Sequence, residues 1–209
     1  MRKGIIKPDG TIVTASSLSD KYEGTNTTIA AKDGTLTSTD VTKTGFYIKK
    51  FMTPNKVVDY EKGETNWMVF RYAEVLLNYA EACVELGDDA EALRAVNLIR
   101  ERAGIAPRTS INRDQVRHER KVELAFENHR WWDIRRWHIA DQLLNAKQFK
   151  ALNPYLVWED GKDVSQMKYI FKIEDAPKDP RTFLPKLYYE SIPADAISTN
   201  PNIKQNPGY

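Results

Sequence analysis

One stretch of the chain, residues 117–137, constrains the fold more than any other because it concentrates both charge and tryptophan. It holds three of the five tryptophans, three glutamates, one aspartate and five arginines. On a helix, its three glutamates would lie one turn apart and repel one another unless cations arrive from elsewhere in the chain. We therefore predict a tertiary ion-pair network with a scaffolding role. Its expected members are Glu119, Glu123, Glu127, Arg130, Asp133 and Arg136.

Composition excludes several classes of function. With 41% hydrophobic and 29% charged residues, the 209-residue chain has the balance of an ordinary globular protein. A net charge of +2 gives no reason to expect nucleic acid as a partner. Cys83 is the only cysteine, so a disulfide framework or a thiolate metal cluster is excluded. We expect no cofactor.

The N-terminal sequence contains no recognisable export signal. Ile5 and Ile6 are followed by Pro8-Asp9-Gly10, whereas a signal peptide needs about 7–15 apolar residues. No window approaches the roughly 20 apolar residues of a membrane helix. We expect a chain that lacks an export address of its own and that is a piece of something longer.

The sequence divides into three segments of different character. Residues 1–66 are rich in Thr, Ser, Gly and Asp, which predicts loops with short strands, the best candidate being Phe46–Phe51. Residues 67–147 read as a helical core. Residues 148–209 hold seven of the ten prolines and read as a loop-rich tail, with short strands at Lys168–Ile173 and Leu187–Tyr189. We predict one mainly α domain with minor β structure.

The helical core begins with a predicted helical hairpin. On the first helix, 67–86, the polar residues occupy one narrow sector and apolar residues the rest, so we expect burial on most sides. Gly87 predicts its end, and the pair Asp88 and Glu91 predicts the start of a second helix that runs to about Ala103. Such a hairpin resembles one tetratricopeptide (TPR) unit.

Two further helices are expected after a loop. The third starts near Asn112 and ends or bends near Asn128-His129, because asparagine tolerates the left-handed conformation. The fourth runs from Arg130 to Lys147 and is apolar all round, which predicts that its tryptophans are buried.

Catalytic patterns are mostly missing. His118-Glu119 lacks the second histidine of a zinc-binding H-E-x-x-H pattern, and the sequence has no Gly-rich phosphate loop and no G-x-S-x-G. We expect no metal site. A glycosidase needs only two carboxyl groups, and Glu119, Glu123, Glu127 or Asp133 could supply them. Arginines one turn away favour structural ion pairs instead.

Aromatic side chains suggest a second route to function, because their faces stack on sugar rings. Those on the predicted helices are expected in the core. Aromatics in loops are the candidates for an exposed ligand-binding platform, above all Tyr155 and Trp158, which lie beside Pro154 and the polar turn Glu159-Asp160-Gly161. The four candidate ligand-binding residues are Tyr60, Tyr155, Trp158 and Tyr169.

Three separated motifs resemble one known family. The helix Arg71–Ala82 (RYAEVLLNYAEA) resembles the signature helix of the SusD/RagB family, and residues 119–137 match its second signature. Ile192-Pro193 and the closing Gln205–Tyr209 (QNPGY) match its characteristic end. Asn128 stands where the family usually has glycine, which suggests a left-handed residue there.

The resemblance implies a function and a location. Members of this family are lipid-anchored proteins of the outer membrane surface that bind glycans or other nutrients, without catalysis, for polysaccharide utilisation. It implies an oligosaccharide or other nutrient as ligand and a SusC-like TonB-dependent transporter as partner. The family's signal peptide, lipidated cysteine and helical N-terminal part are not matched, so we expect the C-terminal portion of such a protein. Two alternatives stay open: a TPR-like scaffold that binds another protein, and a glycoside hydrolase.

Overall fold

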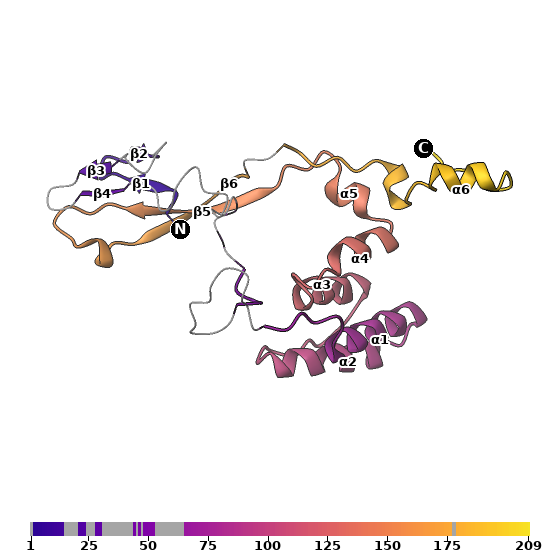
Figure 1. Cartoon of the computed structure of the whole chain (residues 1–209). Coiled ribbons are helices and arrows are strands. Elements are labelled where there is room, and N and C mark those ends of the chain that lie inside the picture. The colour runs from indigo at the N-terminus through magenta and orange to yellow at the C-terminus, as the bar shows by residue number, and fades with distance from the viewer. Residues whose placement is uncertain are drawn as a thin grey trace. The chain divides into compact units, whose positions relative to one another are not determined.

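A computed structural model describes residues 2–14, 21–23, 28–30, 44, 46, 48–52, 65–176 and 179–209. The chain folds into two compact units (Figure 1). The first consists of Met1–Ile48 and Leu143–Phe183, and the second of Lys49–Gln142 and Leu184–Tyr209. Each unit therefore combines two distant stretches of sequence.

The first unit is built on a four-stranded sheet of order β2-β1-β5-β6. Its strands are β1 (Gly4–Ile6), β2 (Ile12–Val13), β5 (Lys150–Val157) and β6 (Tyr169–Asp175). Strand β5 is central: it runs parallel to β1 and antiparallel to β6. Strands β3 (Lys21–Glu23) and β4 (Thr28–Ala30) form a separate antiparallel pair, and η1 (Val164–Gln166) is a short 3-10 helix.

The core of the first unit lies around strands β1 and β5. Ile5, Leu156, Trp158 and Met167 form a buried hydrophobic cluster there. Gly4 allows β1 to approach its neighbours closely, because a Cβ atom at that position would lie 2.6 Å from the carbonyl oxygen of Val13. The sheet thus depends on a residue without a side chain.

The strand predictions met with mixed success. The predicted strand Lys168–Ile173 corresponds to β6, one residue later at its start. Leu187–Tyr189 is wrong: η2 (Pro185–Tyr188) is a 3-10 helix there, and proline at its first position favours a helical turn. In Phe46–Phe51, the described residues lie outside any strand, and Lys50 and Phe51 form a turn.

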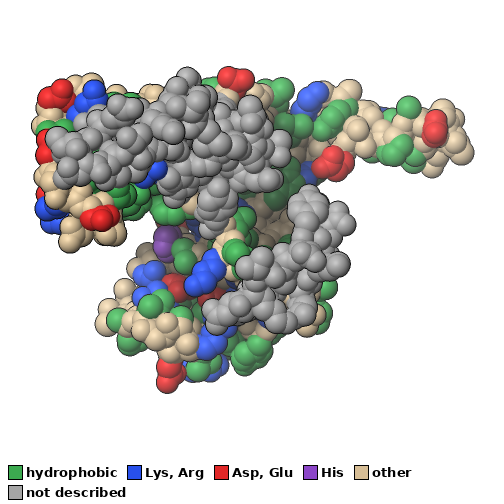
Figure 2. Space-filling view, turned by 60° about the vertical axis from the view of Figure 1, so that its left-hand side comes forward, with side chains coloured by type: hydrophobic (Ala, Val, Ile, Leu, Met, Phe, Trp, Pro, Cys, Tyr) green, Lys and Arg blue, Asp and Glu red, His purple; other side chains and the backbone are tan. Residues whose placement is uncertain are grey.

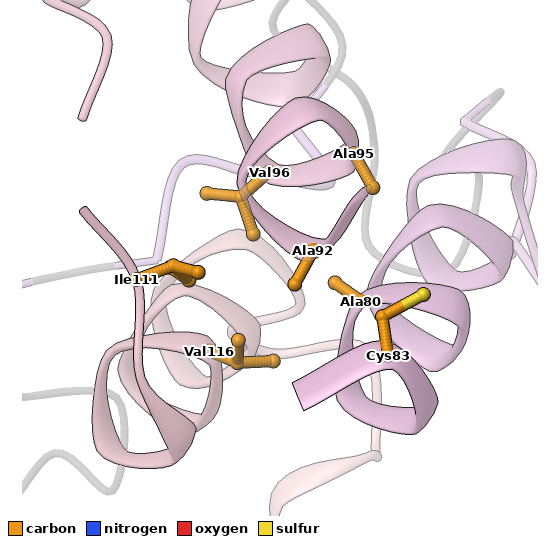
Figure 3. Close-up of a cluster of buried hydrophobic side chains, with 7 residues drawn as sticks. All are labelled: Ala80, Cys83, Ala92, Ala95, Val96, Ile111 and Val116. Carbon is orange, nitrogen blue, oxygen red and sulfur yellow. The ribbon is translucent and has the colours of Figure 1, made fainter. Parts of the chain in front are cut away.

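The second unit begins with the predicted hairpin, α1 (Tyr72–Leu86) and α2 (Asp89–Arg102). Gly87 is left-handed (φ 79°), and the Asp88 N–H closes the end of α1 by donating to the Cys83 carbonyl at 2.8 Å. The Asp88 side chain then accepts from the Glu91 N–H and starts α2. Small side chains line the contact between the helices (Figure 3). The buried cluster consists of Ala80, Cys83, Ala92, Ala95, Val96, Ile111 and Val116.

Helix α1 is shorter and less buried than predicted. It starts at Tyr72, because Arg71 is extended (φ −151°, ψ 164°). It packs through Ala73, Leu77, Ala80 and Cys83, whereas its remaining apolar residues are largely exposed. The expectation of burial on most sides is therefore wrong for this chain.

The next helices are interrupted more often than predicted. Helix α3 (Arg113–Glu123) starts where Asn112 accepts a hydrogen bond from the Gln115 N–H at 2.9 Å. Asn128 is left-handed (φ 66°), as predicted, and so is Phe126 (φ 65°). The single helix expected over 130–147 is two, α4 (Arg130–Arg136) and α5 (Ala140–Leu144), separated at left-handed His138 (φ 51°).

The C-terminal residues are held by side chains that bond to backbone. Gln205 pairs with both the N–H and the carbonyl of Ile192, at 2.8 and 2.9 Å, after the short helix α6 (Ala194–Thr199). The Asn206 amide donates to the Glu190 carbonyl, and the Tyr209 hydroxyl to that of Tyr189. No helix among the described residues is long and apolar enough to cross a membrane.

Candidate functional site

The narrow polar sector of α1 faces α3 and α4 and is the centre of the predicted network. Arg71 binds Glu123 and Glu127, and Glu81 binds Arg136. Asn78 accepts a hydrogen bond from Arg120 at 2.7 Å. Helix α1 and residues 117–137 are therefore the two sides of one polar interface.

Arg71 makes the densest set of contacts in this interface. Its Nε and NH2 donate to the two carboxylate oxygens of Glu127 at 2.7 and 2.8 Å, and its NH1 donates to Glu123 at 2.5 Å. Lys50 forms an ion pair with the same Glu127 carboxylate. Burial works against the charged form of Glu127, yet the hydrogen bonds from Arg71 and Lys50 prevail and lower its pKa.

Two more acids of the segment are paired by arginines from other positions. Arg100 binds Glu119 at 2.9 Å, and Arg108 binds it at 3.3 Å. Asp133, which is 3% exposed, lies between Arg120 at 2.7 Å and Arg136 at 3.0 Å. The spacing of the glutamates requires cations from other parts of the chain, and these arginines supply them.

Arg130 is the one expected member that the structure does not bring into the network. It makes no ion pair within the part of the chain that the structure describes. Burial lowers the pKa of Arg130, and the charge of Asp133 acts in the opposite direction.

Glu81 is a member of the network that we did not predict: it receives hydrogen bonds from Arg136 and from the Trp137 indole at 2.7 Å. The sequence feature that could have indicated its membership is its place in the polar sector of α1.

These contacts bear on the hydrolase alternative. A general acid needs surroundings that keep its carboxyl group protonated, whereas Glu127 is held charged by Arg71 and Lys50. Glu119 and Asp133 are likewise engaged by two arginines each. In the described ranges, no group of three His, Cys, Asp or Glu side chains could hold a metal ion. The arrangement suits structural cross-linking.

The expectation of an exposed platform at Tyr155 and Trp158 is wrong. Each is only 3% exposed. Tyr155 lies on the central strand β5, and Trp158 follows that strand directly and packs in the cluster with Ile5 and Met167. The Tyr155 hydroxyl donates to Glu174 at 2.7 Å, and burial together with this bond raises the pKa of Tyr155 to about 12. Trp158 donates its indole N–H to Asp160 at 3.0 Å. Tyr169, on the outer strand β6, is 42% exposed, and Tyr60 lies outside the described residues.

Aromatics on the helical segment are exposed, which also reverses the prediction. Trp132 is 57% exposed and Phe126, whose backbone is left-handed, is 59% exposed. On the face drawn in Figure 2, hydrophobic side chains lie between charged ones at the surface. The exposed set is Trp67, Phe70, Tyr72, Tyr79, Phe126, Trp131 and Trp132. Arg135 lies over both Trp131 and Trp132 at cation–π distances of 5.3 and 5.7 Å.

Comparisons with known proteins agree on one family. A SusD-like protein of Formosa agariphila is 38% identical over 122 residues, which are 49% of this chain and 24% of that protein. A SusD-like protein of Bacteroides ovatus is 38% identical over 85 residues, 38% of this chain and 16% of that one. The crystal structure of a SusD-like protein from Bacteroides fragilis matches 69% of this chain and 26% of its own, with 35% identity and a TM-score of 0.55.

The chain thus spans about a quarter or less of the length of these relatives. The mainly helical fold with minor β structure is confirmed. The SusD family model matches residues 2–209, which extends the likeness over almost the whole sequence. This chain belongs to the SusD family.

Proposed function

We propose that the chain is the C-terminal portion of a non-catalytic binding protein of the outer membrane surface. It captures oligosaccharide or another nutrient and hands it to a SusC-like TonB-dependent transporter. The observation that carries the proposal is the match of the SusD family model to residues 2–209. Ligand, location and transporter partner are what membership of this family implies.

The state of the acidic residues supports a binding role over hydrolysis. Glu127 and Asp133 are both buried and engaged in ion pairs with arginines, and the lowered pKa of Glu127 disfavours it as the proton donor to a glycosidic oxygen. Arginines at a buried carboxylate stabilise its charged form. The polar centre of the second unit therefore serves to hold helices together, and recognition is left to surface residues.

Tyr169 remains a candidate for ligand contact in the first unit. It begins β6, its partner on β5 is the buried Leu156, and its own ring is 42% exposed. An exposed aromatic ring offers a face on which a sugar ring can stack. Ile173 lies four residues further along the same strand, is 75% exposed and has no ring, so it provides a matched control.

The test measures binding and hydrolysis on the same polysaccharides. The complete protein that carries this chain is run in affinity electrophoresis through gels that contain individual polysaccharides, and release of reducing sugar is assayed in parallel. We expect retardation by at least one polysaccharide with no release of reducing ends. Tyr169→Ala should weaken the retardation and Ile173→Ala should not.

Three results would count against parts of this proposal. Release of reducing ends by the purified protein would overturn the non-catalytic role. Failure to bind any glycan or nutrient would overturn the ligand class. Equal effects of the two substitutions would remove Tyr169 from the site. The transporter partner is tested by affinity purification from outer membranes, where a TonB-dependent transporter should co-purify.

A further inference from the structure

A stacked pair of aromatic rings lies at the surface of the second unit, in the segment that precedes α1. The rings of Phe51 and Trp67 have centroids 5.1 Å apart, and their planes are inclined by 27°. Trp67 is nevertheless 59% exposed. Because Phe51 covers one side of the indole, the surface that Trp67 exposes lies away from Phe51. The pair therefore presents one tryptophan face that is backed by a second ring.

Both rings are attached to residues that bind the same buried carboxylate. Lys50, the neighbour of Phe51, forms an ion pair with Glu127. It also donates to two backbone carbonyls at and just after the end of α3, at 3.0 and 2.9 Å. Arg71, which follows Trp67 closely in the sequence, donates to both oxygens of Glu127 at 2.7 and 2.8 Å. The ion-pair network thus anchors the chain beside each of the two rings.

An anchored and exposed indole is well suited to binding a ligand. A side chain that is ordered beforehand loses little conformational freedom when the ligand arrives. Tryptophan is also enriched among the residues that dominate binding energy, because it offers a large and rigid contact area. Its ring face carries partial negative charge and attracts the C–H groups of a sugar ring. Asn66, directly before Trp67, is exposed and can bond to sugar hydroxyls through its amide.

The size of the exposed ring favours a sugar over a protein as its occupant. An aromatic side chain buries about 150–250 Å² at most. A stable protein interface needs roughly 1,000 Å², several times what one indole supplies. A sugar ring is comparable in size to the indole, and a glycan adds further contacts through its successive rings.

We propose that Trp67, backed by Phe51, is a stacking site for one sugar ring of a glycan. This assignment rests on the proposed function above, since it takes a glycan as the ligand. It gives the ion-pair network a second role, because the contacts of Lys50 and Arg71 with Glu127 keep a binding surface ordered. The site belongs to the second unit, whereas Tyr169 belongs to the first.

Glycan binding by variants of the complete protein tests the proposal. Each variant is run in affinity electrophoresis through gels that contain laminarin, xylan, galactomannan or alginate. Trp67→Ala should weaken binding of the polysaccharide that retards the unsubstituted protein by about tenfold. Trp67→Phe keeps a ring and should retain most of the binding. Phe51→Leu removes the backing ring and should weaken binding by less than Trp67→Ala.

Trp132→Ala is the matched control, because Trp132 lies in the same unit and is 57% exposed. It should leave the retardation unchanged. Equal weakening by Trp67→Ala and Trp132→Ala would overturn the site, and unchanged binding by Phe51→Leu would remove Phe51 from it.

The remaining outcomes separate this site from the proposed function. If the unsubstituted protein and Trp67→Ala are retarded equally, the site is overturned while the proposed function stands. If no polysaccharide in the set retards the unsubstituted protein, both fail together. Loss of a co-purifying transporter in Trp67→Ala, with glycan binding unchanged, would identify a protein contact and overturn the sugar assignment.

A second measurement covers the case in which Trp67→Ala fails to fold. The otherwise unsubstituted protein is labelled with fluorotryptophan, and its fluorine NMR signals are assigned with Trp67→Phe and Trp132→Phe. Addition of the retarding polysaccharide should shift the Trp67 signal and leave the Trp132 signal in place. A Trp67 signal that does not move would overturn the proposal.

Discussion

Arg71 is the residue on which the polar contacts of the helical unit converge. Its guanidinium cross-links Glu123 and Glu127, which come from the end of α3 and the turn after it. Its backbone is extended, and its side chain makes no capping bond to α1. One residue therefore fastens the start of α1 to the end of α3 and to the turn after it.

We expect Arg71→Ala to destabilise the chain by about 2–3 kcal/mol, because the Glu127 carboxylate stays buried with only Lys50 to compensate it. Urea unfolding followed by tryptophan fluorescence measures the loss. Arg94→Ala is the control, since Arg94 pairs with Glu91 at the surface and its loss should be hard to detect. Equal losses in the two variants would refute the role of Arg71.

The lowered pKa of Glu127 predicts how stability changes with pH. A carboxyl group whose pKa is lower in the folded state stabilises the fold above its unfolded value of 4.5, and this contribution is lost as pH falls through the folded value. Urea unfolding between pH 7 and pH 3 should therefore show stability falling on the acid side of pH 4.5. Glu127→Gln should flatten this fall, and Glu101→Gln, at an exposed position, should leave it unchanged.

At the scale of elements, the α1–α2 hairpin explains why the bulky aromatics are on the outside. The helices touch through Ala80, Ala92 and Ala95, each of which is completely buried. Small side chains let two helices approach closely, so the larger residues of α1 must take the remaining faces. Tyr72 and Tyr79 are exposed for this reason in the chain as it stands.

Ala80→Leu should destabilise the hairpin by about 1–3 kcal/mol, because three added carbons have no space between the helices. The loss is measured by thermal unfolding followed by circular dichroism at 222 nm. Ala90→Leu makes the same chemical change on α2 at an exposed position and should be nearly neutral. A stable Ala80→Leu variant would mean that the helices can separate without cost.

Strand β5 is an element that the sequence did not predict, and the reason is its proline. Proline is disfavoured inside a sheet because it lacks the N–H that a neighbouring strand would use, so Pro154 argued for a loop. In the structure, β1 pairs only with Tyr155–Val157 of β5, and at Pro154 it is the proline carbonyl that accepts, from the Lys3 N–H at 2.7 Å. The proline therefore stands where its missing donor matters least to β1. Because the sequence predicts a loop here, Tyr155 is expected at the surface, whereas in the structure it lies on a central strand and is buried.

At the scale of the whole molecule, each of the two units encloses hydrophobic clusters of its own. The cluster around Ile5 and Trp158 belongs to the first unit, and those around Ala80 and Leu77 belong to the second. Residues that are far apart in sequence complete each unit, as when Gly4 pairs with Tyr155. Such pairings leave no local signature from which a domain boundary could be drawn.

Gly4→Val should therefore disrupt the packing of the first unit before it affects the second. The added side chain would collide with the Val13 carbonyl and the Tyr155 ring, which forces β1 away from β5. We expect red-shifted emission that reports exposure of Trp158, together with an almost unchanged helical signal at 222 nm. Val13→Ala is the comparison, because it alters the same strand pair without a collision. Joint loss of both signals in Gly4→Val would contradict separate cores.

The sequence alone was sufficient for features that depend on neighbouring residues. The Gly87 and Asp88 junction, the Asn112 cap and left-handed Asn128 all follow from local backbone chemistry, and the polar sector of α1 follows from helical periodicity. The need for cations opposite Glu119, Glu123 and Glu127 also follows from spacing, because like charges one turn apart must be compensated.

Only the tertiary structure decided which cationic residues pair with these glutamates and which aromatic residues are exposed to solvent. That Arg71 serves Glu123 and Glu127, 52 and 56 residues away, depends on how α1 meets α3. Tyr155 lies between two strands: β1 reaches it through Gly4, 151 residues earlier in the sequence, and β6 reaches it through Ile170. Burial is a property of the packed surface, and periodicity identifies which residues share a face without specifying what covers that face.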